Sequence, residues 1–234
     1  MRAIAALLCI VTHAWTVNAN VEKTIFVAPS PVALPNVRPG LDDLRLDILD
    51  AAHAPILATK LAVQFPTEPA PRGLESWYIL RNLQEGRRYE VRICWPATQP
   101  TDFWLDTYPL THVLDTPNLL SSLAEYSEFR QALELEPPES SEDEVTPESQ
   151  YILFLRIQAA ASYYSTNRTL MDYPPLVDAD IILDPYTLNV LPRSLVPTAI
   201  YISIASVAAW FLSGYIYRWL LSVALERPSK DHAE

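Results

Sequence analysis

The stretch that decides the fold is "NLQEGRRYEVRICWPATQPTDF", residues Asn82 to Phe103. Its middle alternates between two kinds of side chain, as expected of a β-strand, in which successive residues point to opposite faces. The larger and mostly apolar side chains share one face: Tyr89, Val91, Ile93 and Trp95. The opposite face carries the charged and small side chains: Arg88, Glu90, Arg92 and Cys94. The sequence therefore predicts a strand whose first face lies in a hydrophobic core.

Apolar residues alternate in the same way in further segments that are separated by proline-containing breaks. These segments are Thr24–Pro29, Leu41–Leu49, Ala58–Phe65, Ser76–Leu83, Phe103–Leu110, Tyr151–Tyr164 and Asp180–Val190. Short strands at this spacing are typical of an all-β sandwich. We therefore expect one mainly β domain with a single core.

One helix is expected to interrupt the strands. Thr116 can cap its start, and Pro117 suits the first helical position because its missing N–H would have no partner there. The apolar residues that follow predict a single stripe on this helix: Leu119, Leu120, Leu123 and Tyr126.

The turn before the opening strand resembles the fibronectin type III signature. In that signature a leucine lies six residues before a tyrosine whose hydroxyl binds the backbone at the corner. Leu83 and Tyr89 have this spacing, and Gly86 lies between them. Glu85 and Arg87 stand where the family usually has proline and threonine. The resemblance implies an immunoglobulin-like or fibronectin type III-like β-sandwich with a structural core that includes Leu83, Tyr89, Val91, Ile93 and Trp95.

The two ends of the chain predict a membrane topology. Residues 1–19 combine a basic start, an apolar run and small residues before a cleavage point, which is typical of a secretory signal peptide. Residues 195–217 carry no charge and, at ~34 Å as a helix, can cross a hydrocarbon core about 30 Å thick. Basic residues follow this span and indicate its cytosolic side. We therefore expect a single-pass type I protein with a lumenal domain at 20–192, a transmembrane helix at 195–217 and a cytosolic tail at 218–234.

Small residues gather on one side of the predicted transmembrane helix. Helices pack in lipid mainly through close backbone approach, which small side chains permit. At 100° per residue, the small side chains that fall together are Ala205, Ser206, Ala209 and Ser213. We expect this face to contact a partner helix. The alternative is that alanine and serine are simply common in membrane spans.

Charge and cysteine content exclude several classes of protein. A formal net charge of −11 argues against binding nucleic acid, whose phosphates need a basic surface. Much of the acidity lies in residues 134–150, which have too few apolar side chains to offset the entropy of ordering and are expected to form a disordered insertion. Once the signal peptide is removed, Cys94 has no partner for an intramolecular disulfide, so a disulfide-stabilised module is excluded and a packed thiol is expected.

No motif predicts catalysis, a cofactor or a metal site. The chain has four glycines and no glycine-rich phosphate loop. His53 and His112 have no second ligand at metal spacing, and each is expected to lie at the surface. Two acidic groups could in principle hold a metal, namely Asp42, Asp43 and Asp47 in one and Asp178 and Asp180 in the other. We expect the first group to be a solvated strand face opposite Leu44, Leu46 and Ile48, and we give little weight to the D-x-D spelling of the second.

Asn167 begins an Asn-Arg-Thr sequon on the side of the membrane predicted to be lumenal. We expect this asparagine to be exposed and available for N-glycosylation.

The order of these parts, together with "GRRYEVRICWPATQPTDFWLD" (Gly86 to Asp106), resembles the fungal co-activator family of glycosylphosphatidylinositol (GPI) mannosyltransferase II. The resemblance implies an accessory subunit in the endoplasmic reticulum (ER) membrane that supports a separate multi-pass mannosyltransferase, which adds the second mannose during GPI-anchor biosynthesis. It implies no catalytic residue and no cofactor in this chain. The residues alone leave alternatives open: another ER lumenal adaptor, such as a cargo receptor or a membrane-insertion complex subunit, or a cell-surface recognition protein.

Overall fold

The computed structural model describes residues 20–30, 44–133 and 152–225. The predicted signal peptide, the acidic insertion, Asp42, Asp43 and most of the predicted cytosolic tail lie outside these residues. Contacts divide the chain into two compact units, residues 1–186 and residues 187–234. The first unit contains two β-sheets and the second contains a long helix.

The first sheet, called sheet 1, has the strand order β1-β5-β8-β3. The strands along this order are β1 (Val21–Val27), β3 (Ile56–Leu61), β5 (Arg88–Cys94) and β8 (Val177–Thr187), and a fifth, short strand, β9 (Leu191–Pro192), pairs with β8. All three pairings along this order are antiparallel. The opening strand of the sequence analysis, β5, is therefore central, paired on one side with β1 and on the other with β8.

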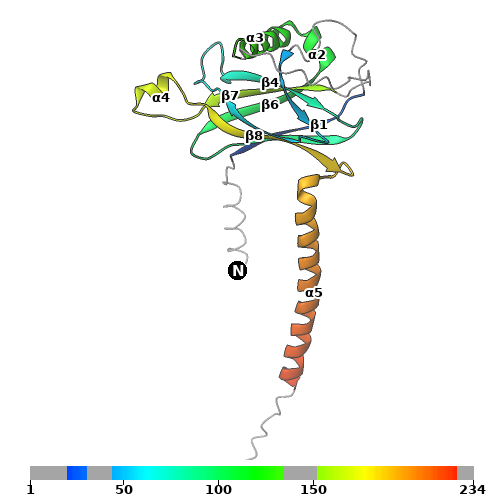
Figure 1. Ribbon diagram of the computed structural model, residues 1–234. Helices are drawn as coiled ribbons and strands as arrows, with labels where there is room; N and C mark the ends of the chain where they lie inside the picture. Colours follow the sequence, from blue (N-terminus) through cyan, green and yellow to red (C-terminus); the bar gives the residue numbers. More distant parts are fainter. Residues whose placement is uncertain (1–19, 31–43, 134–151, 226–234) are drawn as a thin grey trace, which may run out of the picture. The chain divides into compact units, whose positions relative to one another are not determined.

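The second sheet, called sheet 2, has the order β2-β4-β7-β6. Its strands are β2 (Asp47–Asp50), β4 (Leu74–Arg81), β6 (Thr101–Pro109) and β7 (Leu153–Ala161). β4 and β6 both pair with β7 in antiparallel fashion, whereas β2 lies parallel to β4 at one edge. Strands β1 to β8 correspond to the segments in which alternation predicted strands (Figure 1).

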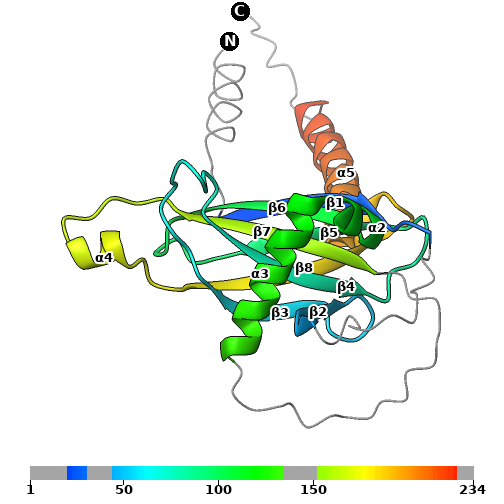
Figure 2. The same ribbon diagram turned by 90° about the horizontal axis from the view of Figure 1, so that it is seen from above.

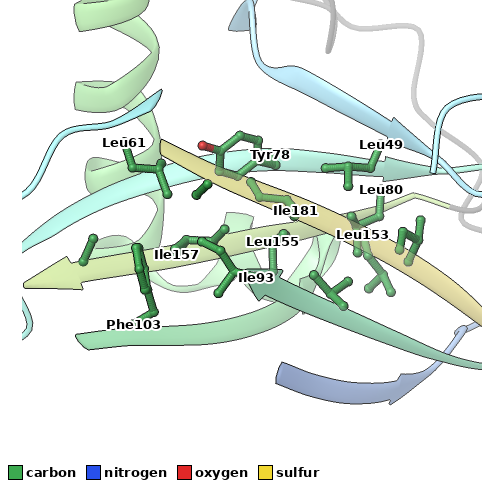
Figure 3. Close-up of a cluster of buried hydrophobic side chains, with 14 of the residues drawn as sticks. Leu49, Leu61, Tyr78, Leu80, Ile93, Phe103, Leu153, Leu155, Ile157 and Ile181 are labelled. Carbon is green, nitrogen blue, oxygen red and sulfur yellow. The ribbon is translucent and has the colours of Figure 1, made fainter. Parts of the chain in front are cut away.

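The main core lies between the two sheets. Side chains from both sheets point toward one another in this layer (Figure 3), and those of Leu49, Tyr78, Leu80, Ile93, Leu155, Ile157 and Ile181 are at most 1% exposed. Such a layer removes apolar surface from water and supplies most of the favourable free energy of folding. The prediction of a mainly β fold is confirmed in this coarse form. Its assignment to the immunoglobulin or fibronectin type III class stays a prediction.

The corner before β5 is built around Tyr89. Gly86 has a φ of +69°, a backbone conformation that favours glycine, and the buried Tyr89 side chain lies close behind it in the sequence. The Tyr89 hydroxyl accepts a hydrogen bond of 2.9 Å from the backbone N–H of Gln84. Leu83, Val91 and Ile93 are at most 2% exposed, whereas Trp95 is half-buried and packs edge-on against Phe103, with ring centroids 4.7 Å apart.

Two helices cover the outer face of sheet 2. They are α2 (Leu110–Asp115) and α3 (Pro117–Leu133), and α3 runs across the strands (Figure 2). Beneath them lies a second apolar cluster that includes Trp77, Ile79, Val113 and Phe154. Sheet 2 therefore buries apolar residues on both faces, which explains the continuous apolar run of β4, "WYIL" (Trp77 to Leu80).

The predicted stripe on α3 is wrong at one position. Leu119 and Leu123 are 8% and 4% exposed, and Tyr126 packs against the same cluster. Leu120 is 41% exposed because the contact with sheet 2 is a narrow line of residues three or four apart, and Leu120 lies beside that line. The helix does begin at Pro117 as predicted, but the sequence analysis did not anticipate α2 or α4 (Arg168–Asp172).

The predicted pattern around β2 is also wrong. Leu46 is buried beneath the helices and Leu49 is buried between the sheets, whereas Ile48 is 38% exposed. The apolar residues around this edge strand pack into two different clusters, one on each side of sheet 2. A pattern with one buried face therefore predicts their burial incorrectly. Asp47 is not simply solvated: its carboxylate lies 3.0 Å from the Arg130 guanidinium of α3.

The second unit is a short strand, a turn and a long helix. β9 (Leu191–Pro192) and the 3-10 turn η2 (Arg193–Leu195) lead into α5 (Val196–Leu225). The most apolar 18-residue stretch within residues 193–225 has a mean hydropathy of 1.9 and none of it is buried, so by length and composition this helix could cross a membrane. At ~1.5 Å per residue α5 is about 45 Å long, which exceeds the thickness of a hydrocarbon core.

Candidate functional site

A cluster of polar side chains surrounds Arg156 on the outer face of sheet 2, beside the helices. Arg156 lies on β7 directly opposite Asp106 of β6, and its guanidinium is 2.8 Å from the Asp106 carboxylate. The same nitrogen donates a 2.8 Å hydrogen bond to the Tyr108 hydroxyl, and the other terminal nitrogen is 3.5 Å from Glu75 of β4. We call Glu75, Asp106, Tyr108, Arg156 and Gln158 the Arg156 cluster.

Glu75 connects this cluster to helix α3. One of its carboxylate oxygens accepts a 2.7 Å hydrogen bond from the Gln158 amide, and the other accepts one from the Ser122 hydroxyl. Ser122 in turn accepts a 3.0 Å hydrogen bond from the indole N–H of the fully buried Trp77. The network therefore fixes α3 on sheet 2 and satisfies the polar group of a core tryptophan.

Aromatic rings and cations extend the cluster. The Arg156 guanidinium lies 5.3 Å from the centre of the Tyr108 ring, and His112 of α2 stacks on the same ring at 5.6 Å. Arg72 lies 5.5 Å from the centre of the Trp104 ring. Burial raises the pKa of the Tyr108 phenol, Arg156 opposes this rise and Asp106 adds to it. The phenol is therefore a neutral hydrogen-bonding group at physiological pH.

This arrangement is suited to recognition rather than to bond making. Most of its donors and acceptors are already paired with one another, and its rings and charges are held on rigid strands. The buried Nε of Arg156 has no hydrogen-bond partner among the described residues. A half-exposed surface of this kind offers planar rings and fixed charges to another macromolecule.

The outer face of sheet 1 carries a second charged group, centred on β5. Glu90 is only 3% exposed, although alternation predicted that its face is opposite the core. Lys23 of β1 lies 3.1 Å from its carboxylate, and Arg92 lies 3.6 Å from Glu90 and 3.8 Å from Asp184 of β8. Burial raises the pKa of the neighbouring Tyr186 phenol, and Glu90 adds to the rise. Longer side chains thus cover two acidic groups that an isolated strand would expose.

Some residues considered in the sequence analysis as metal or catalytic candidates have structural contacts instead. His53 is exposed and lies 3.3 Å from Asp50, three residues away. Asp178 forms a 2.8 Å ion pair with Lys60 of β3, and hydrogen bonds from Lys60 and Gln99 hold the pKa of its carboxyl below the usual value. The described residues contain no group of three or more side chains that could hold a metal ion. The first aspartate of the D-x-D spelling therefore has a structural partner on the neighbouring strand.

A cavity of about 320 Å³ lies away from these clusters, at the end of the domain near α4. It is lined by Val63, Tyr163, Leu170 and Val177 and by the β5–β6 turn, and none of its lining side chains is charged. Its lining offers little chemistry that would select a particular ligand.

The remaining predicted site residues are on exposed surfaces. Asn167 is the N-cap of α4, where its side-chain oxygen accepts a 3.0 Å hydrogen bond from the Thr169 N–H, and it is exposed. Its glycosylation stays a prediction. The small residues of α5, Ala205, Ser206, Ala209 and Ser213, are all exposed on the helix surface. Ser206 donates to the backbone carbonyl of Ile202, so its hydroxyl is already satisfied within the helix.

Sequence reasoning missed the Arg156 cluster. The available signal was the segment "LFLRIQAAA", in which Arg156 and Gln158 are the only polar side chains of an otherwise apolar strand. Polar residues in a buried strand need partners, but nothing in the sequence indicates which distant residues supply them.

Comparison with known proteins gives two matches. The model of the family described as GPI-Mannosyltransferase II co-activator matches residues 64–122, about a quarter of the chain. A curated protein of Schizosaccharomyces pombe named as a GPI mannosyltransferase 2 subunit is 25% identical over 136 residues, which cover 56% of this chain and 52% of that protein. The chain thus matches about half the length of this relative. No solved structure matches.

These matches confirm the resemblance indicated by the sequence motifs. The matched segment contains β4, β5, β6 and α2, so it includes the Tyr89 corner. It also supplies Glu75, Asp106 and Tyr108 of the Arg156 cluster.

Proposed function

We propose that the chain is a non-catalytic accessory subunit of an ER membrane mannosyltransferase that adds the second mannose during GPI-anchor biosynthesis. The observation that carries this proposal is the match of residues 64–122 to a family described as a co-activator of GPI mannosyltransferase II. The relative in Schizosaccharomyces pombe, itself named as a subunit of such an enzyme, also supports it. In this role a separate multi-pass chain carries out the chemistry, and the present chain binds it.

The proposed topology is type I. A signal peptide at 1–19 directs the chain to the ER, residues 20–192 form the lumenal domain, residues 195–217 cross the membrane and residues 218–234 are cytosolic. The length and hydropathy of α5 support the membrane span, and Arg218 next to Trp219 supports the position of its cytosolic end.

Two surfaces are proposed for contact with the catalytic subunit. The first is the small-residue face of α5, centred on Ala209. The second is the outer surface around the Arg156 cluster, because most of its residues lie in the segment that the co-activator family shares.

The proposal is tested by depleting the chain in its own cells and analysing GPI precursors. We expect a precursor that bears a single mannose to accumulate, because the next mannose cannot be added efficiently. Affinity purification of the tagged full chain in mild detergent should recover a multi-pass mannosyltransferase.

A substitution outside the proposed contact surfaces serves as a control. Asp178→Ala should leave the precursor profile unchanged, because this side chain pairs with Lys60 and is not proposed to act in chemistry or in partner binding. A normal precursor profile after depletion, or recovery of secretory cargo in place of a mannosyltransferase, would contradict the proposed function.

A further inference from the structure

The turn that joins β8 to β9 has an unusual residue at its tip. Leu188 and Asn189 both have positive φ, at +53° and +57°, and the N–H of Val190 donates a 3.1 Å hydrogen bond to the carbonyl of Thr187. This is a two-residue hairpin turn in which both central residues adopt the left-handed conformation. Such turns favour asparagine, aspartate and glycine. Leucine in this conformation is sterically disfavoured.

The same leucine is almost fully exposed. The Leu188 side chain is 91% exposed and that of Val190 is 78% exposed. In water, a polar residue or glycine at position 188 would relieve the backbone and expose no apolar surface. The turn conformation therefore gives no reason for a leucine at this position, and its exposure is unfavourable in water, so the exposure points to surroundings that accept an apolar side chain at this turn.

The turn lies next to the proposed membrane span. Residues 187–192, "TLNVLP", carry no charge, Arg193 follows them, and α5 begins at Val196. All of these residues from Thr187 onward belong to the second compact unit. A fully extended chain from Leu188 to Val196 would reach ~26 Å, and the turn and η2 make the real distance shorter.

The aromatic residues at the C-terminal end of α5 indicate where its N-terminal end lies in the membrane. Tyr215, Tyr217 and Trp219 surround Arg218, which is the pattern of a membrane–water boundary. A hydrocarbon core about 30 Å thick corresponds to ~20 helical residues. Counting back from Tyr215 places the other boundary at about Val196, a few residues from the hairpin.

We infer that the tip of the β8–β9 hairpin, Leu188 to Val190, inserts into the interfacial layer of the lipid bilayer beside the lumenal end of α5. The lipid acyl chains bury Leu188 and Val190, and Arg193 lies at the level of the lipid phosphates. The hairpin is thus a second, shallow membrane contact that limits rotation and tilt of α5. This inference rests on the membrane topology proposed above.

Lipid-attached quenchers test the contact. The full mature chain with Cys94→Ala as background receives Leu188→Cys, and the cysteine carries an environment-sensitive fluorophore. The protein is reconstituted alone into phosphatidylcholine vesicles that contain a lipid with a nitroxide near the top of its acyl chain. We expect the probe at position 188 to show blue-shifted emission and to lose most of its fluorescence to this quencher.

Two further labelled positions calibrate the result. Val207→Cys lies in the middle of α5 and should be quenched best by a nitroxide deep in the acyl chain. Leu120→Cys lies on the exposed side of α3, in the other compact unit, and gives the quenching of an exposed position outside the hairpin.

The outcomes separate the inference from the topology on which it rests. Quenching at position 207 without quenching at position 188 would overturn the hairpin contact and leave the span intact. Absence of quenching at both positions would overturn the membrane span and the inference together. Equal quenching at positions 188 and 120 would also overturn the inference, because the contact would then not be specific to the hairpin.

Discussion

At the scale of single residues, two side chains of β5 have different structural roles: Tyr89 packs in the core and Arg92 pairs with buried carboxylates. Tyr89 belongs to the core face and also closes the corner through its hydroxyl. Arg92 belongs to the opposite face, where alternation alone suggests a dispensable surface residue. Its guanidinium instead faces Glu90 and Asp184, whose side chains are 4% and 7% exposed.

Tyr89 can be dissected by two substitutions. Tyr89→Phe removes only the acceptor for the Gln84 N–H and should lower the free energy of unfolding by about 1–3 kcal/mol. Tyr89→Ala also removes the ring and should cost about 3–5 kcal/mol, comparable with the whole stability of a small domain. Thermal unfolding of the full chain in detergent measures both. Equal stability of the phenylalanine variant and the original protein would show that the corner hydrogen bond contributes nothing.

Arg92→Ala should also destabilise the protein. The substitution removes the cation that faces two buried carboxylates, and the expected loss is about 1–3 kcal/mol. Arg168→Ala, on the exposed side of α4, is the matched control and should have little effect. The same unfolding measurement distinguishes them, and identical stabilities of the two variants would mean that Arg92 is indeed an ordinary surface residue.

At the scale of elements, α3 shows why a helical pattern does not by itself locate the buried line. Leu119, Leu120 and Leu123 are equivalent in hydropathy, yet only the first and the last lie against sheet 2. The helix is oriented by contacts that are not in its own sequence, among them the hydrogen bond between Ser122 and Glu75.

A pair of substitutions on α3 tests this orientation. Leu123→Ala should cost about 2–5 kcal/mol, because it leaves a cavity in the cluster beneath the helix. Leu120→Ala should change the free energy of unfolding by less than about 0.5 kcal/mol, as is usual for exposed positions. Chemical denaturation of the full chain in detergent gives both values. A larger effect at position 120 than at position 123 would mean that the helix is rotated from the described orientation.

At the scale of the whole molecule, the proposed role depends on how the chain holds its partner. The bulky residues of α5, such as Val207, lie on a different side from Ala209, and lipid can accommodate extra volume on a lipid-facing side. If α5 binds its partner through the small-residue face, a larger side chain should weaken binding only when it is placed on that face.

Ala209→Leu should accordingly reduce recovery of the mannosyltransferase when the tagged chain is purified in mild detergent. Val207→Leu adds a side chain of the same final size on the other side and should leave recovery unchanged. Quantitative mass spectrometry of the purified complexes measures the ratio. Equal recovery with the two variants would place the main contact outside this helix face and favour the surface around the Arg156 cluster.

The sequence by itself determined the features that depend on neighbouring residues. The strands β1 to β8, the start of α3 and the apolar helix that could cross a membrane were predicted because alternation, capping residues and hydropathy act over a few positions along the chain. The family resemblance was indicated in the same way, by a short stretch that includes the Tyr89 corner.

Only the tertiary structure decided which distant segments meet. The parallel pairing of β2 with β4 and the burial of apolar residues on both faces of sheet 2 were not foreseen, and this is why Leu120 and Ile48 were wrongly placed in a core. Glu90 is covered by Lys23, 67 positions away, and Arg156 is paired with Asp106, 50 positions away. The energy of such pairs depends on separation in space, which a linear pattern of residue types does not contain.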